Sequence, residues 1–265
     1  MGYENMGKVK KDELIDMYIN KNMTLKQIGN FYGISAMAVC KHVKKHNIRY
    51  KKTSGRPIYW NNIFNEDDDF IYLMGFIYAD GCIVKNGNSF SLRLSVAETD
   101  LEHLIKISKI VNKNIKINKY IMNDGAQDRY MFQINGMDIL DIVSKYGIIP
   151  RKSYNWIEPQ IPPNLLSSFL RGWFDGDGCA YTHNNRYLRL SVVGNDEAIS
   201  YYIRSLKTLG YNGNIYKRKH NTEYSSLDMG NIKDCKLFYN LVNGPLRLER
   251  KWSKIESILK IRCEL

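Results

Sequence analysis

Two related stretches of nine residues decide the fold of this protein. Residues 73–81 read LMGFIYADG, and residues 170–178, 97 positions further along the chain, read LRGWFDGDG. Each is followed by an alternating stretch, SLRLSV at 91–96 and YLRLSV at 187–192, which is typical of a β-strand with one buried face. These strands are 96 positions apart, so we expect the second copy to have lost one residue in its turn. Self-similarity of this kind indicates an internal duplication.

Each copy continues with the same series of elements. Helices are expected at 100–111 and 196–209, and further strands at 115–120, 129–134, 215–219 and 224–229. Each copy then closes with a helix and a basic turn, GIIPRKS at 147–153 and GPLRLERKWS at 244–253. The sequence therefore predicts an α+β fold in which the unit helix, two strands, helix, two strands, helix (αββαββα) occurs twice, about a pseudo-two-fold axis.

Small residues lie where the two repeated helices would touch. Gly75 and Ala79, like Gly172 and Gly176, are four positions apart and therefore share one face of a helix. Such faces let two helix backbones approach closely. We expect the two copies to pack against each other through these helices.

An aspartate ends each of these helices. Asp80 and Asp177 occupy the last turn, where the helix dipole disfavours an acidic side chain. If the helices pack side by side, the carboxylates converge and repel each other unless a cation lies between them, and partly hydrated oxygen ligands suit Mg²⁺. Gly81 and Gly178 are expected to end the helices in the left-handed conformation. Asp-Gly is also a common turn at a helix end, which explains one copy better than two matching copies.

The charge of the chain is concentrated near its amino terminus. The net charge is +12, and residues 1–60 contain 12 basic and 4 acidic side chains, a net +8. This excess predicts a separate basic module whose partner is a polyanion, with nucleic acid first. No membrane partner is expected, because no window of about 18 apolar residues occurs. We expect a soluble, intracellular protein, in the cytoplasm of a microbe or a phage-infected cell, with its five cysteines reduced.

Residues 1–48 are expected to form three short helices, at 12–19, 24–31 and 35–46, with Gly33 breaking the chain between the last two. This arrangement resembles the helix-turn-helix family of DNA-binding modules. In that family the helix after the turn enters the major groove, so the residues that would face DNA here are Ser35, Ala36, Met37, Lys41 and Lys44. The alternative is a small helical bundle that packs against its neighbour.

Residues 49–65 are expected to form a basic linker. The stretch RYKKTSGRP at 49–57 combines basic residues with Gly, Ser and Pro and has no periodicity. Arg49 and Arg56 would contact DNA there. A solvated tether without DNA contacts is the alternative.

The two nine-residue stretches and the strands after them resemble the LAGLIDADG homing endonucleases, in the single-chain form with two motifs. The resemblance covers about residues 66–260 and implies a saddle of two halves, 66–155 and 156–265, whose sheets straddle DNA. The metal-binding acids of that family fall on Asp80 and Asp177, and the adjoining Gly81 and Gly178 are included in the predicted site for Mg²⁺ (or Mn²⁺). One departure occurs at the sixth motif position, which is Tyr78 in the first copy and Asp175 in the second, and it leaves the packing of the helices open.

The resemblance also implies supporting residues in the active site. The family's basic residue maps onto Lys152 and Lys251, beside Arg151 and Arg250, although positive residues that neutralise phosphates away from the chemistry would look the same. A polar residue that positions water maps loosely onto Glu98 and Asn195.

Alternation along the strands predicts which side chains face DNA. The apolar side chains of SLRLSV and YLRLSV would point to the helices, which leaves the polar ones on the opposite face. A sheet face of this kind fits a major groove, where Arg and Gln read base edges. The predicted contacts are Ser91, Arg93, Ser95, Arg129, Gln133, Tyr187, Arg189, Ser191, Lys217, Arg218 and Lys219. An ordinary solvated sheet face is the alternative.

The leading hypothesis is a monomeric, site-specific endonuclease that cuts double-stranded DNA at a long, asymmetric target. A non-cutting DNA-binding regulator or an intron maturase on the same scaffold is the alternative, although such a protein has no need of two facing carboxylates. An RNA-binding protein is a third possibility, which tighter binding to RNA than to duplex DNA would reveal.

Overall fold

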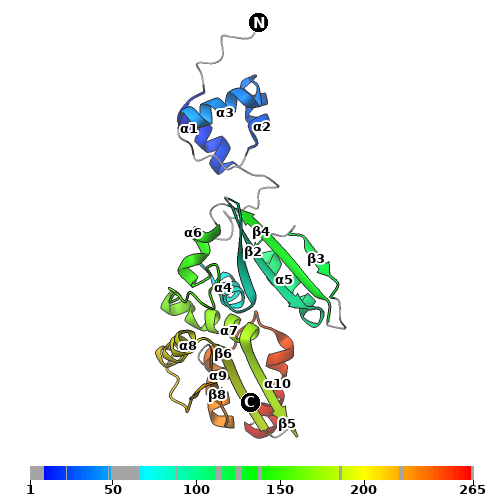
Figure 1. The fold of residues 1–265 in the computed structure, drawn as a ribbon, viewed down its shortest axis with the longest axis vertical. Helices are drawn as coiled ribbons and strands as arrows, with labels where there is room; N and C mark the ends of the chain where they lie inside the picture. The colour runs from blue at the N-terminus through cyan, green and yellow to red at the C-terminus, as the bar shows by residue number, and fades with distance from the viewer. Residues whose placement is uncertain are drawn as a thin grey trace. The chain divides into compact units, whose positions relative to one another are not determined.

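The computed structural model divides the chain into two compact units, Met1–Pro57 and Ile58–Leu265 (Figure 1). The second unit is called the body below. The predicted linker contacts Arg49 and Arg56 lie outside the described residues. The structure describes residues 9–21, 23–46, 48, 66–87, 89–111, 115–122, 127–136, 139–184, 187–220 and 224–263.

The first unit consists of short helices around a small apolar core. Its elements are α1 (Lys11–Ile15), the π-helical turn η1 (Asp16–Asn20), α2 (Leu25–Tyr32) and α3 (Ala36–Lys45). Thr24 begins α2 with a capping box, and Ser35 caps α3 by accepting from the Ala38 amide. Gly33 links these helices with φ +67°, a left-handed conformation that favours glycine. The core includes Leu14, Ile28, Val39 and Val43.

The body contains two halves with the same order of elements. The first comprises α4 (Asp68–Asp80), β1 (Gly81–Asn86), β2 (Ser89–Ala97), η3 (Glu98–Asp100), α5 (Leu101–Val111), β3 (Ile117–Tyr120), β4 (Arg129–Gly136), α6 (Ile139–Val143) and η4 (Ser144–Tyr146). The second comprises η5 (Pro163–Leu165), α7 (Leu166–Asp177), β5 (Gly178–His183), β6 (Tyr187–Gly194), α8 (Asp196–Thr208), β7 (Tyr216–Lys219), β8 (Ser225–Met229), α9 (Ile232–Val242) and α10 (Glu249–Cys263).

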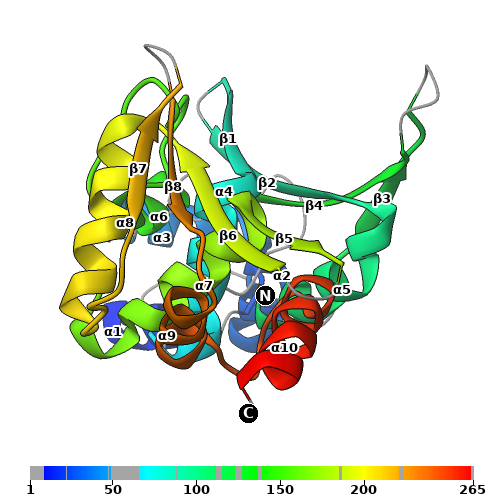
Figure 2. The same ribbon diagram turned by 90° about the horizontal axis from the view of Figure 1, so that it is seen from below.

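Each half builds one antiparallel, four-stranded sheet. The strand orders are β1-β2-β4-β3 and β5-β6-β8-β7, so the sheets have the same topology. Figure 2 shows helices α9, α10 and α5 below the strands and α8 at the left, beside β7. The predicted α+β fold with a duplicated αββαββα unit is confirmed. None of the described helices is long and apolar enough to cross a membrane.

The second hairpin turn is longer than the first, so the predicted loss of a residue was wrong. The hairpins close at Asn86 with Ser89 and at His183 with Tyr187, which gives the second turn one residue more. Counted from the motif glycines, Leu94 is therefore equivalent to Val192, 98 positions away. Matching the LRL letters of the two strands shifts this alignment by two residues. Because side chains alternate with a period of two, a shift of two residues leaves each side chain assigned to the same face of the sheet.

The halves also end differently. In the second half the predicted basic turn GPLRLERKWS runs into the long helix α10, which packs against β5 and α9. In the first half the corresponding stretch, residues 147–162, contains turns and extended chain instead. The basic residues of the two halves are therefore presented by different structures.

Helices α4 and α7 pack closely at the centre of the body. A Cβ added at Gly75 would lie 2.1 Å from the Phe169 carbonyl oxygen, and one at Gly172 would lie 2.0 Å from the Tyr72 carbonyl oxygen. A Cβ at Gly176 would lie 2.2 Å from the Cβ of Ala79. All four small residues that were expected at a helix interface therefore lie at the interface between α4 and α7. Larger side chains would clash there.

Candidate active site

Asp80 and Asp177 are the last residues of α4 and α7, and the close packing of these helices brings them together. Asp80 Oδ2 lies 3.4 Å from the position that a Cβ would take at Gly176. Gly81 and Gly178 have φ of −83° and −84°, so the left-handed conformation predicted for them was wrong. Both begin strands immediately, and a Cβ there would lie 2.6 Å or less from a carbonyl oxygen of the preceding helical turn.

Both aspartates bind protons more tightly than usual. The pKa of Asp177 is raised to about 6, first by burial and then by the charge of Asp80, while Lys152 and Lys251 oppose the rise. The pKa of Asp80 is also raised by removal of water, against the opposing charges of Lys251, Lys152 and Arg129. The carboxylates of Asp80 and Asp177 repel each other at the carboxyl ends of α4 and α7. The region between them therefore attracts cations.

Lys152 and Lys251 approach the same two helix ends, one from each half. Lys152 Nζ donates to the Gly81 carbonyl oxygen. Lys251 Nζ donates to the Gly178 carbonyl at 2.6 Å and to three more carbonyls at the end of α7, those of Phe174, Asp175 and Gly176. Burial lowers the pKa of both lysines, and the charges of Asp80 and Asp177 oppose this effect. The structure thus brings together both lysines and both aspartates predicted for the site.

The sixth motif positions are each hydrogen-bonded by a tryptophan, which the sequence did not reveal. Trp156 Nε1 donates to Tyr78 Oη at 3.1 Å, and Trp252 Nε1 donates to Asp175 Oδ1 at 2.7 Å. Each tryptophan follows the lysine of its own half, by four residues and by one. The signal was the Lys…Trp pair after each half, in KSYNW and KW.

Asp175 belongs to a buried network that joins the halves. Its Oδ2 accepts from Tyr72 Oη at 2.7 Å and from the Leu248 amide at 2.6 Å. Tyr72 Oη also lies 2.7 Å from His103 Nε2. Burial raises the pKa of Asp175 to about 6 and lowers the pKa of His103 to about 4. The departure at the sixth motif position is therefore a satisfied structural contact.

The donors at the helix ends suit a hydrated divalent cation. No group of three or more His, Cys, Asp or Glu side chains that could enclose a metal occurs in the described part of the chain. Two carboxylates with raised pKa, open to solvent on one side, fit Mg²⁺ or Mn²⁺ that keeps waters or takes phosphate oxygens. The carbonyls of Gly81 and Gly178, predicted as part of this site, accept from the two lysines instead.

Glu98 and Asn195 both have structural partners. Glu98 accepts from Tyr130 Oη at 3.1 Å and lies 3.7 Å from Lys119 Nζ. Asn195 begins α8 by accepting from the Ala198 amide at 2.8 Å, although it also lines a cavity of about 700 Å³ with Asp177. Nothing in these contacts sets Glu98 beside the aspartates.

The open face of the first sheet carries a connected polar network. Arg93 Nε donates to Gln133 Oε1 at 2.8 Å, and Gln133 Nε2 donates to Asn135 Oδ1 at 2.6 Å. Ser91 is only 1% exposed and donates to Asn135 as well, so its predicted contact with DNA is not available in this structure. Arg129 donates from Nε to Ser95 Oγ at 3.0 Å. Arg93 and Arg129 remain the cationic groups of this face.

The open face of the second sheet carries an exposed tyrosine and two arginines that form ion pairs with Asp228. Tyr187 is 43% exposed. Arg189 donates from Nη2 to Asp228 Oδ1 at 2.6 Å, and Arg218 Nε lies 3.3 Å from Asp228 Oδ2.

Lys217 and Lys219 lie on the helix side of this sheet, so their predicted place on the DNA face was wrong. Lys217 is the Cα partner of the buried Leu227, and its Nζ lies 2.8 Å from Asp196 of α8. Lys219 has the same parity as Lys217 along the strand, and its charge acts on the same aspartate. Consecutive side chains of a strand cannot share a face, and only Arg218 of this basic run is on the open one.

The predicted DNA contacts of the first unit lie on its surface. Met37, Lys41 and Lys44 of α3 and its capping residue Ser35 are all exposed, and Met37 is 69% exposed. Whether they meet DNA stays a prediction.

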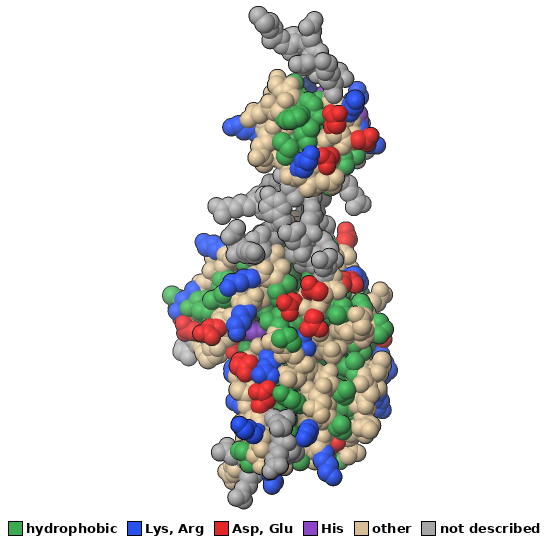
Figure 3. Space-filling view, turned by 180° about the vertical axis from the view of Figure 1, so that it is seen from behind, with side chains coloured by type: hydrophobic (Ala, Val, Ile, Leu, Met, Phe, Trp, Pro, Cys, Tyr) green, Lys and Arg blue, Asp and Glu red, His purple; other side chains and the backbone are tan. Residues whose placement is uncertain are grey.

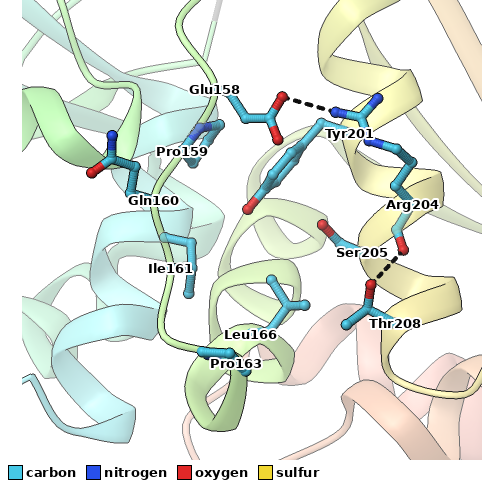
Figure 4. A pocket seen from close by; sticks show the side chains of 10 residues that line it. All are labelled: Glu158, Pro159, Gln160, Ile161, Pro163, Leu166, Tyr201, Arg204, Ser205 and Thr208. Carbon is cyan, nitrogen blue, oxygen red and sulfur yellow. Dashed lines mark hydrogen bonds and ion pairs between the residues drawn. The ribbon is translucent and has the colours of Figure 1, made fainter.

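A second cavity lies away from the aspartates. It has a volume of about 380 Å³ between α8 and residues 158–166, which lead into α7 (Figure 4). Glu158 and Arg204 form an ion pair at 2.9 Å across its rim. None of the predicted site residues lines it. The face of the body seen in Figure 3 mixes Lys and Arg with Asp and Glu side chains, in keeping with a body of nearly balanced charge.

Comparison with known proteins supports the interpretation of the body. Residues 164–244 match the LAGLIDADG-like domain family. The homing endonuclease I-WcaI bound to its DNA recognition sequence superposes with a TM-score of 0.52 and 18% identity, over 80% of this chain and 97% of that one. I-DmoI in complex with DNA and Ca superposes with a TM-score of 0.50 and 15% identity, over 74% and 98%.

The body therefore has the fold of the LAGLIDADG homing endonucleases. By sequence, the match to the LAGLIDADG-like domain family lies within its second half. Among curated proteins, the replication factor C small subunit of Methanocaldococcus jannaschii is 22% identical over 98% of this chain. The chain spans only 15% of the length of that relative.

Proposed function

We propose that this protein is a site-specific endonuclease that hydrolyses both strands of a DNA duplex with divalent cations held by Asp80 and Asp177. The observation that carries the proposal is the convergence of two mutually repelling carboxylates at the ends of paired helices. A regulator that only binds DNA would gain nothing from this arrangement, in which burial and then the charge of Asp80 raise the pKa of Asp177 to about 6. I-DmoI, which shares the fold, was solved with DNA and Ca.

The chain's own residues supply the surroundings for hydrolysis. A bound cation would lower the pKa of the attacking water and stabilise the departing oxygen. Lys152 and Lys251 place positive charge beside both aspartates, where a scissile phosphate would bring further negative charge. The two open sheet faces, with Arg93, Arg129 and Arg218, would bind duplex DNA on either side.

The test is cleavage of duplexes selected from a random library, with Mg²⁺ or Mn²⁺ present. We expect double-strand cutting by the wild type and a loss of at least about a hundredfold in Asp80→Asn and Asp177→Asn, with duplex binding retained. Lys109→Ala, on the outer side of α5, is the matched control and should cut normally. Duplex binding without cutting under any divalent cation would favour the non-cutting regulator, and tighter binding to RNA would favour an RNA-binding role.

A further inference from the structure

The strand register places two arginines at different distances from the paired aspartates. Arg93 is the Cα partner of Cys82, one residue beyond Gly81. Arg189 is the Cα partner of Tyr181, three residues beyond Gly178. Arg189 therefore lies two strand positions further out. Because a strand rises about 3.4 Å per residue, this offset is about 7 Å.

The two positions are exchanged between the halves. Ser191, the counterpart of Arg93 in the second half, is the Cα partner of Cys179. Ser91, the counterpart of Arg189 in the first half, is the Cα partner of Val84. At these two positions of the open face, each strand therefore has one arginine and one serine, in opposite order.

Both arginines are held from the neighbouring strand by the same edge of the guanidinium group. Gln133 of β4 accepts from Arg93 Nε at 2.8 Å. Asp228 of β8 accepts from Arg189 Nε at 3.0 Å and Nη2 at 2.6 Å. No described residue accepts a hydrogen bond from Nη1 of Arg93 or Arg189. Each guanidinium is thus fixed in place with its outer edge available.

This arrangement suits guanine, because paired N–H groups on an arginine match the N7 and O6 acceptors in the major groove. A fixed guanidinium also loses less conformational freedom on binding than a mobile one. Base pairs follow each other at about 3.4 Å along the duplex, so an offset of about 7 Å between the arginines corresponds to about two base pairs.

We propose that Arg93 and Arg189 each read one guanine, and that the guanine read by Arg189 lies about two base pairs further from the centre of the target. The inference rests on one part of the proposed function, namely that the open faces of both sheets bind the same DNA duplex. It assigns an asymmetric target to a chain whose two halves have the same fold.

The decisive experiment moves an arginine along its strand. The double variant Arg189→Ser with Ser191→Arg keeps the charge, and Asp228 is the Cα partner of residue 191, so an acceptor stays within reach. Duplexes that bind the wild type and the variant are selected from a random library and sequenced, without any requirement for cutting. We expect the preferred guanine of that half-site to move about two base pairs toward the centre, with the other half-site unchanged.

Single variants test the reading itself. Arg93→Ala and Arg189→Ala should each lower the preference for guanine at one position by about tenfold to a hundredfold. Asp228→Asn, which frees Arg189 and Arg218 and removes a negative charge, should bind random duplex more tightly and discriminate less at the Arg189 position. Lys109→Ala is again the matched control, with unchanged preferences.

Three results would overturn the inference. Identical selected sequences for the wild type and the alanine variants would mean that the arginines contact only phosphates. A preferred guanine that stays in place in the double variant would refute the two-base-pair offset. Absence of duplex binding would remove this inference together with the proposed function, whereas selective binding without cutting would remove the endonuclease and leave the inference standing.

Discussion

The two halves of the body are alike where they touch and different around their aspartates. At the interface, Gly75 and Gly172 meet the opposite backbone at nearly equal distances. Around the acids, Lys152 reaches a single carbonyl from a turn, whereas Lys251 is buried in the first turn of α10 and donates to four carbonyls. The two halves are therefore closely symmetric at the packed interface between α4 and α7 and less symmetric around the aspartates.

The largest effects are expected at the symmetric interface. Gly172→Ala would put a Cβ 2.0 Å from the Tyr72 carbonyl oxygen, and Gly75→Ala would put one 2.1 Å from the Phe169 carbonyl oxygen. Each substitution should lower the free energy of unfolding by about 3 kcal/mol or more, measured by urea denaturation. Clearly unequal losses would contradict a symmetric interface. Gly87→Asn, in an open hairpin turn with φ +58°, is a mild control.

The lysines should separate stability from activity. Lys251→Met leaves buried carbonyls at the end of α7 without their donor and should cost about 2–4 kcal/mol in the free energy of unfolding. Lys152→Met removes one such bond, so its main effect should be on the cleavage rate. Thermal melting and single-turnover cleavage of both variants test this difference. Equal destabilisation would show that the two lysines are held alike.

The aspartates should differ in their response to pH. The raised pKa of Asp177 means that its protonated form stabilises the fold, an advantage present below pH 4 and lost as the pH rises through about 6. Asp177→Asn should therefore raise the free energy of unfolding at pH 7.5 by about 1–2 kcal/mol without metal, and have no effect near pH 4. Asp80→Asn should also raise the free energy of unfolding at pH 7.5, but by a smaller amount, because the Asp80 side chain is more exposed. Melting curves at both pH values provide the measurement.

Added Mg²⁺ gives the matching control. It should stabilise the wild type at pH 7.5 and lose this effect as Asp177 is protonated below about pH 6. Stabilisation of Asp177→Asn by Mg²⁺ to the same extent would show that the cation binds elsewhere.

The smallest expected effects concern the two tryptophans. Trp252→Phe removes one of three donors to the buried Asp175 and should cost about 1–2 kcal/mol. Trp156→Phe removes the donor to Tyr78, a neutral hydroxyl, and should cost less than about 1 kcal/mol. Denaturation of the two variants side by side would show whether the sixth motif positions are as unequal as their chemistry suggests.

The sequence predicted the duplication, the order of elements and the paired aspartates, because each depends on local periodicity or on a repeated motif. It failed where position depends on register. The offset between Arg93 and Arg189 follows from one extra turn residue in the second hairpin together with one residue fewer between the motif glycine and the arginine. A shift of two residues leaves no trace in an alternating pattern. Lys217 and Lys219 were misplaced because a run of basic letters does not show which parity faces the helices.

The residues of the candidate site also divide into those that a local pattern predicts and those whose roles depend on distant contacts. Asp80 and Asp177 were found because their position in a helix opposes the helix dipole. The roles of Asp175, Trp156 and Trp252 depend on contacts between residues up to 103 positions apart, which no local pattern contains.

The contrast between Tyr78 and Asp175 bears on how such a chain can change over time. In a pair of identical subunits, every substitution occurs on both sides of the axis at once, so a helix contact can change only to a residue that tolerates its own copy. With both halves in one chain, each sixth motif position can acquire its own partner, a hydroxyl with Trp156 on one side and a carboxylate with Trp252 on the other. Covalent joining thus lets the two halves evolve separately.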